Sequence, residues 1–224
     1  ENLKVLLTTL NSKFIHTNLA IRYIKESIKD LVDVDIREYT INNQLDYILK
    51  DIYLAKYDAI FFSTYIWNIY DIVKLCENIK KVNPNVIIGL GGPEVSYDSE
   101  EAMEKYEFVD YIIRGEGEMV MRDLMKHFNG EMDIKHVDGI TYRQDGKIIQ
   151  NKERMLLADL DLIPSPYENL DITEYENRIV YYETSRGCPF NCQYCLSSAI
   201  KGLRYFGIDR VKRDLKNLID ARVS

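Results

Sequence analysis

The sequence lacks any apolar run approaching the roughly 18 residues that a membrane-spanning helix needs. Its first residues also lack the basic segment followed by an apolar segment that marks a secretory signal. Basic residues are outnumbered by acidic ones, and the formal charge of -7 argues against a general nucleic-acid or anionic-membrane surface. We therefore expect no membrane span. We also expect a cytoplasmic location, because the cytoplasm keeps clustered cysteines reduced.

Cysteine is also scarce, and three of the four cysteines fall in one short stretch, SRGCPFNCQYCLS. Cys188, Cys192 and Cys195 follow the spacing C-x-x-x-C-x-x-C. Gly187 and Pro189 flank the first of them, which predicts a loop and not the interior of a helix. Three thiolates without a fourth nearby ligand suit a metal centre that keeps one coordination position open. An iron–sulfur cubane, which four cysteines normally hold, would keep one iron open here.

Zinc and a disulfide framework fit this stretch less well. A structural zinc ion is normally held by four ligands, and the three histidines lie far upstream in the sequence, at His16, His127 and His136. A disulfide framework would leave one cysteine of the three unpaired. The fourth cysteine, Cys76, follows a helical pattern of apolar residues and is expected to be buried. A cluster is therefore favoured, with zinc as the alternative.

Apolar, β-branched segments alternate with helical patterns over residues 1–130. The expected strands cover residues 3–9, 32–39, 58–64, 86–90 and 109–113, and the expected helices cover residues 17–30, 44–55, 69–82, 99–106 and 115–128. Five strands that alternate with five helices predict an α/β fold with a five-stranded parallel sheet covered on both faces. The size suits a flavodoxin-like, doubly wound domain, in which ligands bind at the carboxyl ends of the strands.

Small and polar residues gather where three of the expected strands end. They are Ser63, Thr64 and Tyr65, then Gly91, Gly92, Pro93, Glu94 and Val95, then Gly115, Glu116 and Gly117. Glycine lets a ligand approach the backbone closely, although it also forms ordinary turns. The acidic residues of a receiver domain and the G-x-G-x-x-G fingerprint of a dinucleotide site are both missing, and an FMN phosphate loop would be a weak match.

Two further regions follow the first domain. Residues 131–177 are expected to form a hairpin, turned at Asp145-Gly146, and then a linker that Pro164 and Pro166 keep extended. Residues 178–224 begin another domain, with a strand over 178–183 before the cysteine loop and a helix over 210–221. These residues supply about one βα unit of a barrel that needs roughly 200 residues or more.

The cysteine motif, with the aromatic Tyr194 before its last cysteine, resembles the signature of the radical S-adenosylmethionine superfamily. The layout as a whole resembles the B12-binding class of that superfamily, in which a cobalamin-binding domain precedes the radical domain. The stretches that carry this resemblance are TTLNSKFIHTNLAIRYI, GLGGPEVS at 89–96, RGEGE at 114–118 and DLDLIPSP at 159–166. In that class, methyl-transferring cobalamin domains carry D-x-H-x-x-G, whose histidine binds cobalt. Here His16 stands without the aspartate and the glycine, so its ligation of cobalt is left open.

The resemblance implies an enzyme. Cys188, Cys192 and Cys195 would hold a [4Fe-4S] cluster, Tyr194 would lie beside the adenine of S-adenosylmethionine, and the strand-end residues would line a slot for cobalamin. The reaction would be radical methyl transfer, ring formation or rearrangement, with an electron donor such as flavodoxin or ferredoxin. The catalytic residues and the substrate stay unknown, and the residues present are expected to be inactive by themselves. The alternatives are a corrinoid or tetrapyrrole-binding module without turnover and a zinc-stabilised regulatory domain.

Overall fold

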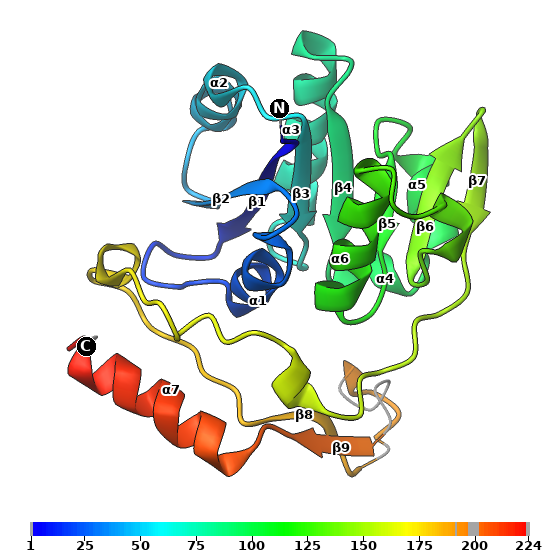
Figure 1. Cartoon of the computed structure of the whole chain (residues 1–224). Coiled ribbons are helices and arrows are strands. Elements are labelled where there is room, and N and C mark those ends of the chain that lie inside the picture. The colour runs from blue at the N-terminus through cyan, green and yellow to red at the C-terminus, as the bar shows by residue number, and fades with distance from the viewer. Residues whose placement is uncertain (1, 191, 197–201, 223–224) are drawn as a thin grey trace.

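The computed structural model describes residues 2–190, 192–196 and 202–222. Its main sheet contains β1 (Lys4–Asn11), β2 (Asp33–Thr40), β3 (Ala59–Ser63), β4 (Ile87–Gly91), β5 (Tyr111–Ile113), β6 (Ile140–Gln144) and β7 (Lys147–Gln150). The strand order is β2-β1-β3-β4-β5-β6-β7 (Figure 1). The first five strands run parallel, and β6 and β7 add an antiparallel hairpin beside β5. The predicted doubly wound sheet is thus confirmed, and the predicted hairpin extends it to seven strands.

Helices cover both faces of the sheet because the side chains of each strand alternate in direction. On β3, Ile60 and Phe62 face one apolar cluster, whereas Ala59 and Phe61 face the other. The first cluster includes α2 (Leu45–Ala55), α3 (Ile69–Val82) and α5 (Ser99–Lys105), and the second includes α1 (Leu19–Ile28) and α6 (Gly117–Phe128). All five helices were predicted, and a short additional helix, α4 (Pro93–Ser96), follows β4.

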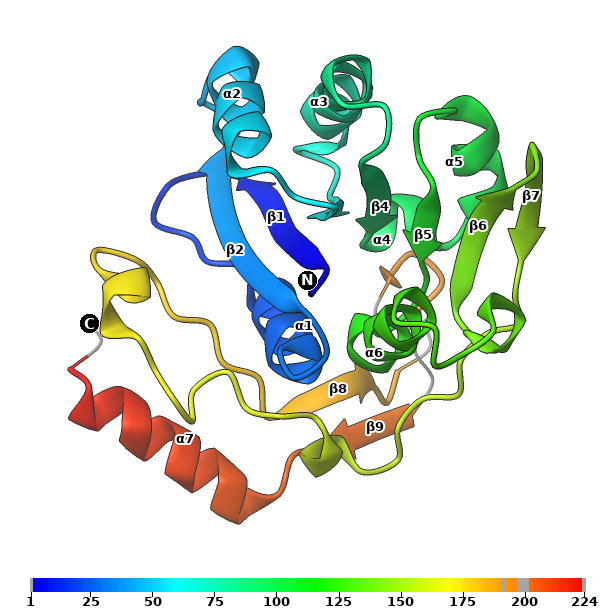
Figure 2. The same ribbon diagram turned by 45° about the horizontal axis from the view of Figure 1, so that its top comes forward.

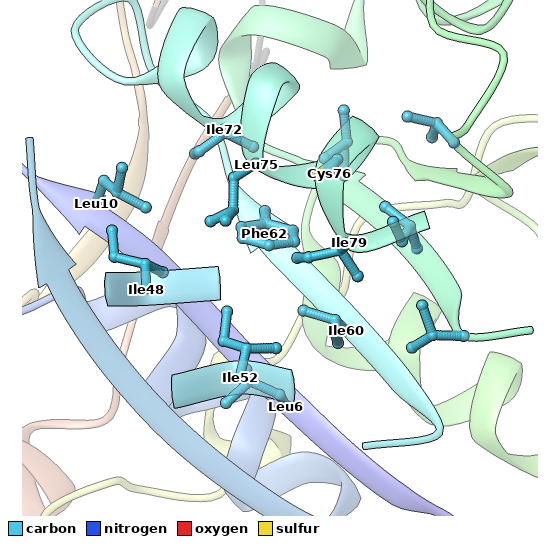
Figure 3. Close-up of a cluster of buried hydrophobic side chains, with 14 of the residues drawn as sticks. Leu6, Leu10, Ile48, Ile52, Ile60, Phe62, Ile72, Leu75, Cys76 and Ile79 are labelled. Carbon is cyan, nitrogen blue, oxygen red and sulfur yellow. The ribbon is translucent and has the colours of Figure 1, made fainter. Parts of the chain in front are cut away.

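Cys76 lies on the inner face of α3, among the apolar side chains of the first cluster (Figure 3). The residue is fully buried, as the sequence predicts. Burial raises the pKa of its thiol, because the apolar surroundings disfavour the thiolate. Cys76 is therefore a core residue, separate from the three cysteines near the C-terminal end.

The predicted strand over residues 178–183 is wrong. Within this described range, Ile179 forms an isolated parallel bridge with His16, and the regular strand starts later, as β8 (Ser185–Cys188). This stretch forms no regular strand because it lies beside a loop and not beside another strand. The amide of Ile179 donates to Ile15 O at 2.7 Å, in the loop after β1. β8 pairs antiparallel with β9 (Gly202–Tyr205), and α7 (Ile208–Asp220) follows.

The segment between β7 and β8 packs against the first domain and is not a detached linker. Leu160 and Ile163 are fully buried, and they join Tyr23 of α1 and Val211 of α7 in a third apolar cluster. The buried Arg210 of α7 donates to Leu160 O at 3.3 Å. Figures 1 and 2 both show this yellow segment running between α1 and α7. Ile163, which precedes Pro164, has the expected extended backbone, and packing fixes the segment.

Candidate functional site

The carboxyl ends of β1 and β3 are tied together by buried polar side chains. Thr9 Oγ1 donates to Ser63 O at 2.9 Å. Asn68 Nδ2 donates to Leu10 O at 3.0 Å and to Ser63 O at 3.3 Å. Its Oδ1 accepts from the amide of Tyr65 at 2.7 Å. These bonds satisfy backbone groups that the strands leave unpaired at their ends, so the edge of the sheet is a fixed surface.

Asn68 was not recognised from the sequence as part of this edge. It is the residue before α3, where asparagine normally caps the helix. In the structure its side chain turns away from α3 and binds the strand ends instead. Asn18 holds the same position before α1, and its Nδ2 lies 3.4 Å from both Ser63 Oγ and Tyr65 Oη. An asparagine directly before the helix that follows β1 and before the helix that follows β3 is the signal that would have found both.

Gly92 packs against the end of β3. Thr64 donates twice to Gly91 O, from its amide and from Oγ1, each at 2.7 Å. Gly92 has a φ of +101°, and a Cβ at this position would lie 2.4 Å from Thr64 O. The glycine is therefore required by the close approach of two backbones. Of the next residues, Val95 is buried and Glu94 is exposed, so they face opposite environments.

A stack of two aromatic rings follows β3. The rings of Tyr65 and Trp67 lie 4.6 Å apart with an interplanar angle of 3°. The Trp67 side chain is 48% exposed, and Ile66 between them is 79% exposed. An exposed flat apolar surface beside a hydrogen-bonded strand edge is suited to a large planar ligand.

The loop after β5 contains two glycines with different roles. A Cβ on Gly117 would lie 2.9 Å from Ile24 Cδ1, so this glycine lets α6 approach α1. Gly115 has a φ of +73° and open space where a Cβ would be. Gly115 and Glu116 line a small cavity of about 40 Å³ together with residues 154–157. The carboxylate of Glu116 is bound by Arg204, whose Nη1 donates to Oε2 at 3.1 Å.

Cys192 and Cys195 lie in a loop, as predicted, whereas Cys188 belongs to a strand. Cys188 ends β8, after Gly187 with a φ of +91°, and the amide of Cys195 donates to Cys192 O at 3.1 Å. Cys192 is exposed, and Cys188 and Cys195 are half-buried. Tyr194 is 93% exposed. Within the part of the chain that the structure describes, no three His, Cys, Asp or Glu side chains are close enough to hold one metal ion.

The cysteine loop still fits an iron–sulfur cluster by its chemistry. Three soft thiol ligands stand within eight residues at the surface, where a cluster has access. The three thiols are not gathered around one point in this conformation, so ligation would have to draw them together. The assignment of Cys188, Cys192 and Cys195 to a cluster therefore stays a prediction.

His16 lies where the loop after β1 meets the segment before β8. Its Nδ1 lies 2.6 Å from Tyr181 Oη, and its backbone bridges Ile179. Thr17 Oγ1 donates to Ile179 O at 2.8 Å. Nearby, the buried carboxylate of Glu38 at the end of β2 forms ion pairs with Arg22 at 2.8 Å and with Arg178 at 3.2 Å. The contacts of Tyr181 with His16 and of Arg178 with Glu38 hold residues 178–181 at the carboxyl ends of β1 and β2.

A family model for the B12-binding domain matches residues 5–125. The chain belongs to this family. The match covers nearly all of β1 to β5 and of their helices. This part of the structure carries residues 63–68, 91–95 and 115–117 at the carboxyl ends of the strands, which we call the strand-end surface.

Two curated relatives extend the similarity beyond this domain. An uncharacterized methyltransferase of Pyrococcus horikoshii is 34% identical over 155 residues, which are 66% of this chain and 34% of the relative. The cobalamin-dependent radical SAM methyltransferase TokK of Streptomyces tokunonensis is 29% identical over 170 residues, or 71% of this chain and 25% of TokK. The chain thus spans about a third or less of these relatives. The resemblance to B12-binding radical S-adenosylmethionine enzymes that the sequence predicts is confirmed.

A solved structure of the cobalamin-dependent S-adenosylmethionine radical enzyme OxsB, with aqua-cobalamin and S-adenosylmethionine bound, has the same fold. The TM-score is 0.80 at 22% identity, over 99% of this chain and 32% of OxsB. The fold of both the sheet and the segment that follows it is therefore shared. Among the described residues, every helix is too short or too polar to cross a membrane.

Proposed function

We propose that the chain is the N-terminal part of a cobalamin-binding radical S-adenosylmethionine enzyme. One observation carries the proposal: the hairpin that leads into the cysteine loop lies against the loop after β5, at the carboxyl edge of the B12-binding sheet (Figure 2). In open α/β sheets this edge is where ligands bind. The two cofactor sites of such an enzyme would then face each other.

Cobalamin would bind at the strand-end surface. Tyr65, Trp67 and Ile66 offer an exposed apolar surface for a macrocycle, and the hydrogen bonds of Asn68 hold the floor beneath it. Gly91 to Val95 and Gly115 to Gly117 would border the slot. Within these ranges, Gly92 allows the close contact with the backbone of Thr64. The carboxylate of Glu116 is bound to Arg204 and is therefore not available to the ligand.

The cysteine loop would hold the second cofactor. Cys188, Cys192 and Cys195 would ligate a [4Fe-4S] cluster, and Tyr194 would move from its exposed position to lie beside the adenine of S-adenosylmethionine. When bound, the cluster supplies the electron that cleaves S-adenosylmethionine reductively for methyl transfer, ring formation or rearrangement. The protein supplies binding, orientation and exclusion of side reactions. The electron would come from a donor such as flavodoxin or ferredoxin, in a cytoplasm that keeps the thiols reduced.

Anaerobic reconstitution of the full-length protein with iron, sulfide and hydroxocobalamin tests this proposal. We expect about four iron, four sulfide and one cobalt per chain, and cleavage of S-adenosylmethionine on reduction. Cobalt without iron would favour a corrinoid-binding module without turnover. Stoichiometric zinc with neither would favour a regulatory domain.

The strand-end surface has its own test in a titration with hydroxocobalamin. Trp67→Ala removes a ring from the surface and should weaken binding about tenfold. Tyr53→Ala is the matched control, because this equally exposed ring lies at the cavity between α2 and α3, at the amino ends of β3 and β4. Equal affinities for the two variants would place cobalamin elsewhere.

A further inference from the structure

The hairpin before and after the cysteine loop carries two arginines on neighbouring strands. Arg186 of β8 and Arg204 of β9 are directly opposite each other in the antiparallel register. Like charges in such a cross-strand pair repel each other. Both side chains are nevertheless largely buried, with 12% and 13% of their surface exposed. Burial of two adjacent positive charges requires negative partners.

The partners come from the start of α6, in the RGEGE stretch after β5. Glu118 Oε1 lies 2.5 Å from Arg186 Nη2. Glu116 binds both arginines: its Oε2 accepts from Arg204 Nη1 at 3.1 Å and lies 3.7 Å from Arg186 Nη1. A single carboxylate therefore bridges the two strands of the hairpin and joins them to the B12-binding domain.

A third carboxylate completes the cluster from the chain just before β8. Glu183 Oε1 accepts from Arg186 Nε at 2.9 Å and from Nη2 at 2.7 Å. Burial raises the pKa of Glu183, the Arg186 charge opposes this, and Glu118 and Glu116 add to it. The Arg186 guanidinium also lies over the Tyr23 ring, 5.2 Å from its centroid. Arg186 is thus held by Glu183 on one side and by Glu116 and Glu118 from the start of α6 on the other, which fixes its orientation as well as its position.

We propose that Glu116 and Glu118 are positioning residues that hold the cysteine hairpin at one fixed place against the cobalamin domain. The inference rests on the proposed function for its purpose, since two cofactors can act together only at a fixed separation. Arg186 is two residues before Cys188, and Arg204 is two residues after Gly202, the cross-strand partner of Cys188. The ion pairs therefore act two residues along each strand from Cys188, the first of the proposed cluster ligands, and from its cross-strand partner.

Charged groups suit this task better than apolar ones. Apolar packing would hold the hairpin at least as strongly, since a buried ion pair loses much of its gain to desolvation. Charge-assisted hydrogen bonds to a guanidinium instead define direction, because its donors lie in one plane. The third apolar cluster already supplies attraction through Tyr23 and Phe206. The carboxylates of Glu116 and Glu118 determine at which position the hairpin lies on the domain.

Hydrogen exchange of the full-length protein, with a double-mutant cycle between Glu116 and Arg204, tests the inference. Glu116→Gln and Arg204→Gln should each lower the protection of the amides of β8 and β9 about tenfold, and the double variant should add little to either. The amides of β1 and β3 should keep their protection in all three. The charge swap Glu116→Arg with Arg204→Glu should restore part of the loss, which a general packing defect would not allow.

The control is Asp30→Asn. This change removes a carboxylate that binds Arg122 of α6 at 2.6 Å but touches no part of the hairpin, so exchange in β8 and β9 should not change. Additive losses in the cycle, or unchanged protection in Glu116→Gln, would overturn the inference. These readouts need neither cofactor. A chain that shows the coupling but binds no cobalamin would contradict the proposed function alone.

Discussion

The imidazole of His16 contacts the phenol of Tyr181, with Nδ1 2.6 Å from Oη. The two residues are 165 positions apart and belong to regions that the sequence assigns to different domains. The backbone beside each of them is joined by the bridge between His16 and Ile179. His16, whose ligation of cobalt the sequence leaves open, is thus a contact between the two regions.

This contact gives a prediction about cobalt. Because His16 stands without the aspartate and the glycine of D-x-H-x-x-G, we expect His16→Ala to leave the absorption spectrum of bound cobalamin unchanged. Because the variant loses the contact with Tyr181, it should increase hydrogen exchange in residues 178–182. Tyr181→Phe is the matched variant, because it removes only the hydroxyl, and it should reproduce the increase. A spectral shift in His16→Ala without one in Tyr181→Phe would instead identify His16 as an axial ligand.

The division of the cysteines is tested by two alanine variants of the full-length protein. Cys188→Ala should abolish cluster assembly and cleavage of S-adenosylmethionine, because two thiolates are too few to hold the cubane. Cys76→Ala should keep both and lose about 1 kcal/mol of stability, the cost of a small cavity around a fully buried side chain. Iron content and chemical denaturation measure the two effects. Similar iron content in the two variants would contradict the division.

The sequence predicts that Gly92 lies where a ligand approaches, and the structure shows a further reason for a glycine at this position. Because a Cβ would lie 2.4 Å from Thr64 O at a φ of +101°, Gly92→Ala should destabilise the domain by about 2 kcal/mol or more. Gly115→Ala shares the positive φ but meets open space, so it should cost about 1 kcal/mol. Urea unfolding gives both values. Equal losses would show that the contact with Thr64 relaxes.

The sheet could be predicted because its signals are local. Continuous apolar runs mark the parallel strands, and Asp145-Gly146 marks the turn between β6 and β7, where both residues have positive φ. The stretch RIVYYE at 178–183 is also rich in β-branched and aromatic residues, yet the strand predicted there is absent. A strand needs a neighbouring strand, and Ile179 pairs only with the loop at His16. Composition reports the tendency to extend, and tertiary contacts decide the pairing.

The candidate site was predictable in position but not in its contacts. The rule that ligands bind at the carboxyl ends of parallel strands locates the surface. It does not reveal that Glu118 reaches Arg186, 68 residues away, or that Asn68 leaves its helix to bind strand ends. Such contacts depend on the relative placement of elements that are far apart in the sequence. The sequence shows the glycines and acids of RGEGE, and only the fold shows that Arg186 and Arg204 are the partners of these acids.

The packed segment between β7 and β8 leads to the last prediction. An unstructured linker would be cut by chymotrypsin throughout, at Leu160 and Leu162 as readily as at Met155. In the structure Met155 is 89% exposed, whereas Leu160 is fully buried and its carbonyl accepts from Arg210. Proteolysis requires local unfolding, so cleavage should start at Met155 and Leu156 and spare residues 157–163.

Leu160→Asp supplies the contrast. It places a carboxylate among the apolar side chains of Tyr23, Ile163 and Phe206, where burial of a charge is costly, and it should release the segment from α1. Cleavage should then extend to residues 162–167, while β1 to β7 stay resistant because their two apolar clusters are separate from the third. Leu162→Asp is the control, since that side chain is exposed and the change should leave the pattern as it was. If wild-type protein is cut at Leu160 as fast as at Met155, the third cluster does not hold this segment in solution.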